Sequence, residues 1–206
     1  MRNPLGVIYN ATNSLDRLVS GSGGSPDGAT LVGIVREECE RLNQIVGDLL
    51  DFARPRQLAL HPEDIGRVLG DVVEALGAQE NMRFEVTIDS ELPPVVVDRR
   101  LMRQALLNVA LNGVQSMPRG GTLHLSASLD PASGDVVIRV RDEGQGISEA
   151  DLPRIFEPFF TNKASGAGLG LAVVKRIIDE HGGSVDVTTG PTGTTFSFRL
   201  PRTRAS

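Results

Sequence analysis

The stretch DRRLMRQALLNVALNGVQSM, residues 98–117, has the apolar spacing of a helix and an unusual polar face. At about 100° per residue, four amide side chains fall within a sector of roughly 80°: Gln104, Asn108, Asn112 and Gln115. Solvated helix faces usually carry Lys and Glu, which favour helix more than Asn does. Amide oxygens can bind a hard cation such as Mg²⁺, and amide N–H groups can bind phosphate. The pattern fits a ligand site and, equally well, an ordinary polar face whose amides bond to neighbouring loops.

Around this helix the chain mixes helix and strand patterns. Asp98 is its expected N-cap. A second helix is predicted over 63–76, with acidic residues at its start, and a third over 170–183, closed by glycines. Six segments have strand patterns: 83–89, 94–97, 121–129, 135–142, 184–189 and 193–200. Residues 121–129 pair with 135–142, and the last two segments form a second hairpin. The sequence therefore predicts an α+β domain with one mixed sheet, covered by helices on one face.

A carboxylate continues the apolar row of one strand in VVIRVRDEGQGI, residues 136–147. Val136, Ile138, Val140 and Asp142 share a face because side chains alternate along a strand. A buried carboxylate needs hydrogen-bond donors, and the amino group of a purine would be a suitable one. Gly144 and Gly146 let the backbone turn sharply and approach a flat ligand closely. The plainer alternative is an Asp that caps a tight turn.

Glycines precede the last helix in FEPFFTNKASGAGLGLAVV, residues 156–174. Gly166, Gly168 and Gly170 lead directly into an apolar helix, whose N-terminal N–H groups can bind an anion. Lys163 adds a positive charge beside them. The spacing matches neither the dinucleotide fingerprint, which needs a glycine at Leu171, nor a Walker loop. The plainer alternative is a flexible hinge.

The first 56 residues have the pattern of a helical hairpin. Both predicted helices have a mostly apolar seam at alternating steps of three and four, typical of a coiled coil: Leu5, Ile8, Thr12, Leu15 and Val19, then Val35, Cys39, Leu42, Val46 and Leu49. SGSGGSPDGA forms the turn, and PRQLALHP, residues 55–62, forms a linker bounded by prolines. The seams could pack on the rest of the chain or form a four-helix bundle in a homodimer. Periodicity leaves these two alternatives about equal.

Composition excludes several classes of function. The net charge of −5 argues against nucleic-acid binding, which needs a basic face. No apolar run approaches the roughly 18 residues of a membrane span, and no signal peptide opens the chain. A single cysteine, Cys39, fits a reducing cytoplasm. The three histidines and this cysteine have no metal-site spacing.

Taken in order, these motifs resemble those of sensor histidine kinases. LLNVALNGVQSM is similar to their N box, DEGQG to the G1 box, FEPFF to the F box, GAGLGL to the G2 box and GPTGTTFSFRL to the closing glycine motif. RNPL and LLDFARP are similar to the preceding dimerisation helices. The resemblance covers nearly the whole chain. It implies a dimerisation and phosphotransfer hairpin over 1–56, followed by a Bergerat-type ATP-binding domain over 57–206.

The resemblance also implies roles for individual residues. Asp142 would accept a hydrogen bond from the adenine amino group. Asn112 would ligate Mg²⁺, and Asn108 would help to position the metal and phosphates. Lys163 would act in the lid over the phosphates, and Asn3 would position water for dephosphorylation. Other residues would line the ATP site: Gly144, Gly146, Ile147, Phe160, Gly166, Gly168, Leu169, Gly170 and Thr195. Gly113 and Ala167 stand where the family usually has Ala and Thr, which could loosen the pocket.

The same resemblance implies ATP, Mg²⁺, a second copy of the chain and the receiver domain of a response regulator as partners. GHKL-type ATPases, such as gyrase, share the fold but carry a general-base Glu at the position of Asn108. An amide cannot take that proton at neutral pH, so transfer is favoured over hydrolysis. A non-catalytic nucleotide-binding dimer is a third interpretation.

The acceptor motif of the family reads His-Glu-x-Arg/Lys-Asn-Pro-Leu, and MRNPL aligns Met1 with x. The acceptor histidine and its acidic neighbour would then lie just before the first residue. His61, in the linker, and His124, on a strand, do not match the motif. His181 follows a helix, where a histidine can cap the helix dipole. We therefore expect the chain to bind nucleotide without phosphorylating itself.

Overall fold

The computed structural model describes residues 57–162 and 168–202, together with Val32, Gly33, Val35, Arg36 and Cys39. The chain divides into two compact units, residues 1–54 with 161–167 and residues 55–160 with 168–206. The five described residues within 1–54 are helical, and Val32 and Cys39 are buried while Val35 is 46% exposed. The rest of the predicted hairpin, with Asn3, lies outside the described residues.

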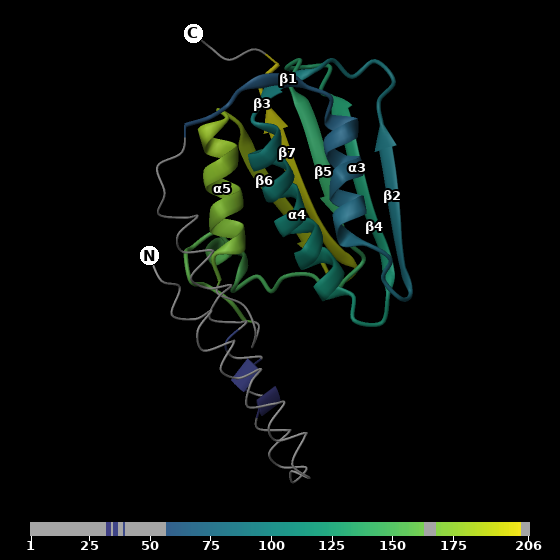
Figure 1. The fold of residues 1–206 in the computed structure, drawn as a ribbon, viewed down its shortest axis with the longest axis vertical. Coiled ribbons are helices and arrows are strands. Elements are labelled where there is room, and N and C mark those ends of the chain that lie inside the picture. The colour runs from purple at the N-terminus through teal and green to yellow at the C-terminus, as the bar shows by residue number, and fades with distance from the viewer. Residues whose placement is uncertain (1–31, 34, 37–38, 40–56, 163–167, 203–206) are drawn as a thin grey trace. The chain divides into compact units, whose positions relative to one another are not determined.

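The second unit is a mixed sheet covered by helices on one face, as predicted. Figure 1 shows α3 (Ile65–Leu76), α4 (Arg99–Ser116) and α5 (Gly170–Glu180) side by side on that face. The strands are β2 (Met82–Ile88), β4 (Gly121–Leu129), β5 (Val136–Arg141), β6 (Ser184–Gly190) and β7 (Gly193–Leu200). Their order is β2-β4-β5-β7-β6. The sheet is mixed because β2 runs parallel to β4, while the other neighbours are antiparallel.

The core lies between the helices and the alternate residues of the sheet that face them. Leu123 and Leu125 of β4, Ile138 of β5 and Phe198 of β7 are at most 1% exposed. The helices contribute their apolar stripes: Val68, Leu69, Leu106, Val109, Val174 and Ile177. A fully buried aliphatic or aromatic side chain contributes about 1.5–3 kcal/mol, so this layer holds the unit together. No helix in the described ranges is long and apolar enough to cross a membrane.

A two-stranded sheet replaces part of the predicted linker. β1 (His61–Glu63) pairs antiparallel with β3 (Val95–Val97), which lies far along the sequence. The predicted linker over 55–62 was therefore wrong for its last two residues, which belong to β1. Three residues that contain a proline give too short a pattern to indicate a strand. Glu63 belongs to β1, so α3 begins at Ile65, with the Asp64 side chain accepting hydrogen bonds from the amides of Gly66 and Arg67.

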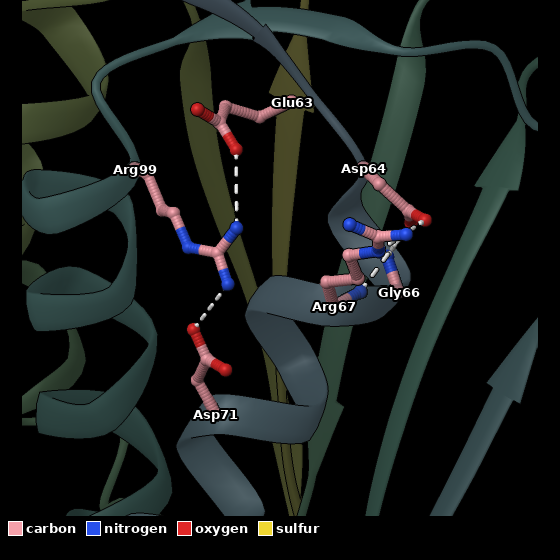
Figure 2. A network of polar contacts seen from close by, with 6 residues as sticks. All are labelled: Glu63, Asp64, Gly66, Arg67, Asp71 and Arg99. Carbon is pink, nitrogen blue, oxygen red and sulfur yellow. Dashed lines mark hydrogen bonds and ion pairs between the residues drawn. The ribbon is translucent and has the colours of Figure 1, made fainter.

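The start of α4 joins several segments of the unit. As predicted, Asp98 is the N-cap, accepting at Oδ1 from the Leu101 amide at 3.1 Å. Its Oδ2 accepts from the Ala59 amide at 3.1 Å, which fixes the chain just before β1. Figure 2 shows the neighbouring Arg99 between Glu63 of β1 and Asp71 of α3, at 3.4 and 2.8 Å. The N-terminus of α4 therefore holds the point where the chain enters this unit.

His181 attaches the end of α5 to the same place. Its Nε2 accepts from the Asp98 amide at 2.9 Å, and its Nδ1 lies 2.7 Å from the Ile177 carbonyl oxygen. These partners assign the proton to Nδ1 and leave the ring neutral. His181 is 5% exposed. It therefore closes α5 by a hydrogen bond to a terminal carbonyl rather than by a positive charge on the helix dipole.

The substitution Asp98→Asn should destabilise the protein by about 2 kcal/mol at pH 7, because an amide N–H₂ would then face the Ala59 N–H. Burial raises the pKa of Asp98, but amide hydrogen bonds from Leu101 and Ala59 outweigh it and hold the pKa below the ordinary 3.8. The folded pKa is thus lower than the unfolded one, so this contribution is full above about pH 4 and is lost below it.

Urea unfolding of wild type and Asp98→Asn between pH 7 and pH 3 tests both statements. Asp71→Asn is the matched control, because it breaks a partly exposed ion pair with Arg99 that should contribute less than about 1 kcal/mol. An equal loss of stability in the two variants would contradict the role given to Asp98.

Candidate functional site

Asp142 lies buried at the end of β5, where the strand meets α4. It is 5% exposed and extends the core-facing row of Val136, Ile138 and Val140, as the alternation predicted. Its amide donates to the Thr194 carbonyl at 2.9 Å, so the backbone of β7 continues alongside it. A carboxylate in this position is costly unless donors surround it.

Those donors converge on one oxygen of the carboxylate. Oδ1 accepts from the Gly144 amide at 2.9 Å, the Ser116 hydroxyl at 3.1 Å and the Thr194 amide at 3.2 Å. These three donors come from the loop after β5, the end of α4 and the start of β7. Oδ2 receives none of them. Among the described residues, the donors that hold this carboxylate therefore act on Oδ1 and not on Oδ2.

Two of the predicted glycines shape the backbone around this carboxylate. A Cβ at Gly144 would overlap the Ser116 side chain, so only glycine allows the Ser116 and Asp142 contacts together. Gly146 has φ +76°, and a Cβ there would also overlap the Gly190 carbonyl oxygen. Both positions are closely packed against other parts of the protein, and the approach to a flat ligand stays a prediction.

Gly113 packs tightly, contrary to the expectation of a looser pocket. A Cβ at this position would lie 2.7 Å from Leu123 Cδ1 and 3.3 Å from Asp142 Cβ. Leu123 is fully buried and fills the space that an alanine methyl would take. Glycine at this position therefore leaves room for Leu123 against α4, a contact that the sequence alone does not reveal.

The pair Gly113→Ala and Leu123→Val should be less destabilising together than the sum of the two single changes, by at least about 1 kcal/mol. Gly113→Ala alone overpacks the core, and Leu123→Val removes the methyl that it meets. Urea unfolding of the four proteins measures this coupling. Gly70→Ala in α3, where the added methyl meets no atom within 4 Å, is the control and should stabilise by up to about 1 kcal/mol. Strict additivity would contradict the packing argument.

A chain of hydroxyl groups continues the polar site beyond Asp142. The Thr189 hydroxyl accepts from the Ile147 amide at 2.8 Å and lies 3.1 Å from the Thr194 hydroxyl. Thr194 is 4% exposed, on the same face as Phe196 and Phe198. Thr195, the predicted site residue, lies on the opposite face of β7 and is not brought to Asp142. Counting back by twos from the two phenylalanines would have indicated Thr194.

The amide face of α4 lies between Asp142 and the start of α5. Asn108 Nδ2 donates to the carbonyl oxygen of Gly170, the first residue of α5, at 3.3 Å. Asn108 and Asn112 are half-buried, whereas Gln115 is exposed. Ser116, one turn beyond Asn112, reaches Asp142 and was missed from the sequence. Its spacing of four from Asn112 places it on the same face and was the available signal.

The glycine-rich loop is described only at its ends. Lys163, Gly166 and Ala167 lie outside the described residues. The backbone of Gly168 (φ +68°) lies so close to Phe159 and Phe160 that a Cβ would overlap them. Leu169 is fully buried before α5, and Phe160 lies 4.5 Å from the Arg154 guanidinium carbon. These residues anchor both ends of the loop on the same unit as Asp142.

The family comparison agrees with this arrangement. Residues 97–204 match the family described as histidine kinase-, DNA gyrase B- and HSP90-like ATPases, and residues 1–58 match the His kinase A (phospho-acceptor) domain. The chain belongs to the two-component sensor histidine kinases. The two matches leave residues 59–96 between them.

Curated relatives of this histidine kinase are longer proteins. It is 34% identical over 205 residues to the sensor histidine kinase ZraS of Escherichia coli K12, covering 98% of this chain and 43% of ZraS. It is 30% identical over 206 residues to sporulation kinase E of Bacillus subtilis 168, covering 98% and 27%. The chain thus spans less than half the length of these relatives.

Solved histidine kinases have the same fold. Full-length ShkA, crystallised with AMPPNP, aligns with a TM-score of 0.74 and 31% identity over 98% of this chain and 46% of ShkA. ThkA in complex with the response regulator protein TrrA aligns with a TM-score of 0.73 and 26% identity, over 98% and 58%. The likeness extends across both predicted domains of this histidine kinase.

Proposed function

We propose that residues 57–206 bind ATP, with the amino group of adenine donating to Asp142 Oδ2. The observation that carries this proposal is that the three protein donors to this buried carboxylate all bind Oδ1, and none of them binds Oδ2. An exocyclic amino group supplies the donor that Oδ2 lacks. The family description, which names ATPases, and the AMPPNP in the ShkA crystal support nucleotide binding.

Asn108 and Asn112 are the residues that would hold Mg²⁺ with the phosphates. Their neutral amide oxygens suit a hard cation that keeps several waters and takes further oxygens from phosphate. The bond from Asn108 Nδ2 to Gly170 orients that amide and leaves its oxygen for another partner. When bound, Mg²⁺ neutralises phosphate charge. The chain itself contributes the orientation of the two amides and the N-terminus of α5, which attracts an anion.

We further propose that the ATP is a phosphoryl donor to a histidine on a helical hairpin, and then to the receiver domain of a response regulator. The phospho-acceptor match over residues 1–58 supports the hairpin, and the ThkA complex with its response regulator supports the second step. The hairpin would act as a homodimer in the cytoplasm. Asn3 would position water for removal of the phosphate, and Lys163 would contact the phosphates.

Transfer is favoured over hydrolysis by the residue at position 108. Gyrase-like ATPases need a carboxylate there to take a proton from water. Asn108 is an amide whose nitrogen already donates to Gly170, so it cannot serve as that base. Bound ATP would therefore remain intact until a protein acceptor takes its γ-phosphate. The alternative, a non-catalytic nucleotide-binding dimer, would have the same binding site but no transfer step.

The metal assignment predicts that Asn112→Ala weakens ATP binding about tenfold with Mg²⁺ present and changes it little in EDTA. The reason is that the amide oxygen would act through the cation and not on the nucleotide directly. Calorimetric titration of the 206-residue chain under both conditions measures this. Gln115→Ala, one turn away on the same helix and exposed, is the control. An equal loss with and without Mg²⁺ would refute the metal role of Asn112.

A further inference from the structure

Ser116 makes a contact with Asp142 that depends on its neighbours. It is the last residue of α4, and its hydroxyl lies 2.7 Å from the Gly113 carbonyl oxygen and 3.1 Å from Asp142 Oδ1. A hydroxyl has one proton to donate, so it is held between these two acceptors. Of the two, a carboxylate is the stronger acceptor.

Two glycines shape the space around the two oxygens of Asp142. Because Gly144 has no side chain, the Ser116 hydroxyl can occupy the space next to Oδ1. On the other side, a Cβ at Gly113 would lie 3.8 Å from Oδ2, so the missing methyl keeps the surroundings of Oδ2 open. The two oxygens therefore differ sharply in their environment.

The other two donors to Oδ1 are backbone amides from the sheet layer. The Gly144 amide belongs to the loop after β5, and the Thr194 amide to the start of β7. Among the described residues, Ser116 is the donor that holds Oδ1 from the helix layer. It therefore opposes rotation of the carboxylate group, which the two amides of the sheet layer hold from the other side.

We propose that Ser116 is a positioning residue that fixes which oxygen of Asp142 meets the base, and thereby selects a purine with an exocyclic amino group. The inference rests on the nucleotide site proposed above. A site arranged for a donor discriminates against a ligand that offers an acceptor there, because a buried polar group is left unpaired. Adenine presents an amino group to Oδ2, whereas hypoxanthine presents a carbonyl oxygen.

The test compares ADP with inosine diphosphate (IDP) by calorimetric titration of the 206-residue chain. In Ser116→Ala we expect ADP affinity to fall five- to tenfold while IDP affinity stays within twofold, so the preference for ADP falls by the same factor. The ratio of the two affinities is insensitive to the fraction of folded protein, because an unfolded fraction affects both ligands equally. Ser126→Ala, on the uncovered face of β4, is the matched control and should leave the ratio unchanged.

The outcomes separate the two proposals. If the wild-type chain binds neither nucleotide, the nucleotide site itself is refuted, and the role of Ser116 with it. If the wild type prefers ADP and Ser116→Ala keeps the same preference, only the role of Ser116 is overturned. An equal loss for ADP and IDP would assign Ser116 to general stability of the site and would also overturn the proposal.

Discussion

Asp142→Asn is expected to lower ADP affinity about 100-fold, which corresponds to about 2.7 kcal/mol. The asparagine oxygen can keep the place of Oδ1, where the Gly144 and Thr194 amides and the Ser116 hydroxyl require an acceptor. Its amide nitrogen then takes the place of Oδ2. The N–H₂ group of the new asparagine would then face the adenine amino group, and both are donors. The charge-assisted hydrogen bond of the wild type would be lost and the two donors would repel each other.

The same variant should bind IDP better than ADP, because an amide N–H suits the carbonyl oxygen of hypoxanthine. Calorimetric titration with both nucleotides gives the two affinities. Asp186→Asn on β6, which removes an exposed carboxylate 3.8 Å from Arg199, is the control and should change neither affinity more than twofold. Undiminished ADP binding by Asp142→Asn would refute the orientation of the base and the nucleotide site as we describe it.

Incubation with γ-labelled ATP should leave the 206-residue chain unlabelled, whereas a version preceded by a helical segment ending in His-Glu should become labelled. Phosphoryl transfer needs an imidazole nucleophile with an acidic neighbour. His181 is buried and uses both ring nitrogens. His124 lies between Glu85 and Glu143, at 3.1 and 3.6 Å, and His61 lies in β1. None of them precedes an Asn-Pro-Leu sequence.

The matched control for labelling carries Gln in place of the added histidine and should remain unlabelled. Acid lability of the label distinguishes phosphohistidine from phosphoserine. Strong acid-labile labelling of the 206-residue chain itself would show that one of its own histidines accepts the phosphate and that the motif argument is wrong.

The sheet and its helices were predictable because their patterns are strong. The alternation in β4, β5 and β7 and the apolar stripes of α3 and α5 fix which faces are buried. β1 could not be predicted, because three residues are too few to show the alternation of a strand. Its partner β3 also lies more than thirty residues away in the sequence. The hydrogen bond that His181 accepts from the Asp98 amide could not be predicted, because Asp98 lies 83 residues earlier in the sequence.

Within the site, position along a strand was predictable and contacts between elements were not. The burial of Asp142 was predictable because it continues the alternating, core-facing row of β5. The resemblance indicates Thr195, whereas the alternation along β7 places the neighbouring Thr194 on the buried face, beside Asp142. Ser116 and the match between Gly113 and Leu123 depend on how closely α4 approaches the sheet, which no local pattern encodes.

The pairing of β5 with β7 has a consequence for folding. β4 with β5 and β6 with β7 are hairpins that close over short stretches of chain, whereas β5 meets β7 only after about fifty residues have been spanned. Short loops close early and long ones late, because closure entropy grows with loop length. Asp142 belongs to the first hairpin, and the Thr194 amide that it needs belongs to the second. Neither hairpin alone supplies all the donors that hold the carboxylate. Nucleotide binding should therefore appear during folding only after β5 has paired with β7.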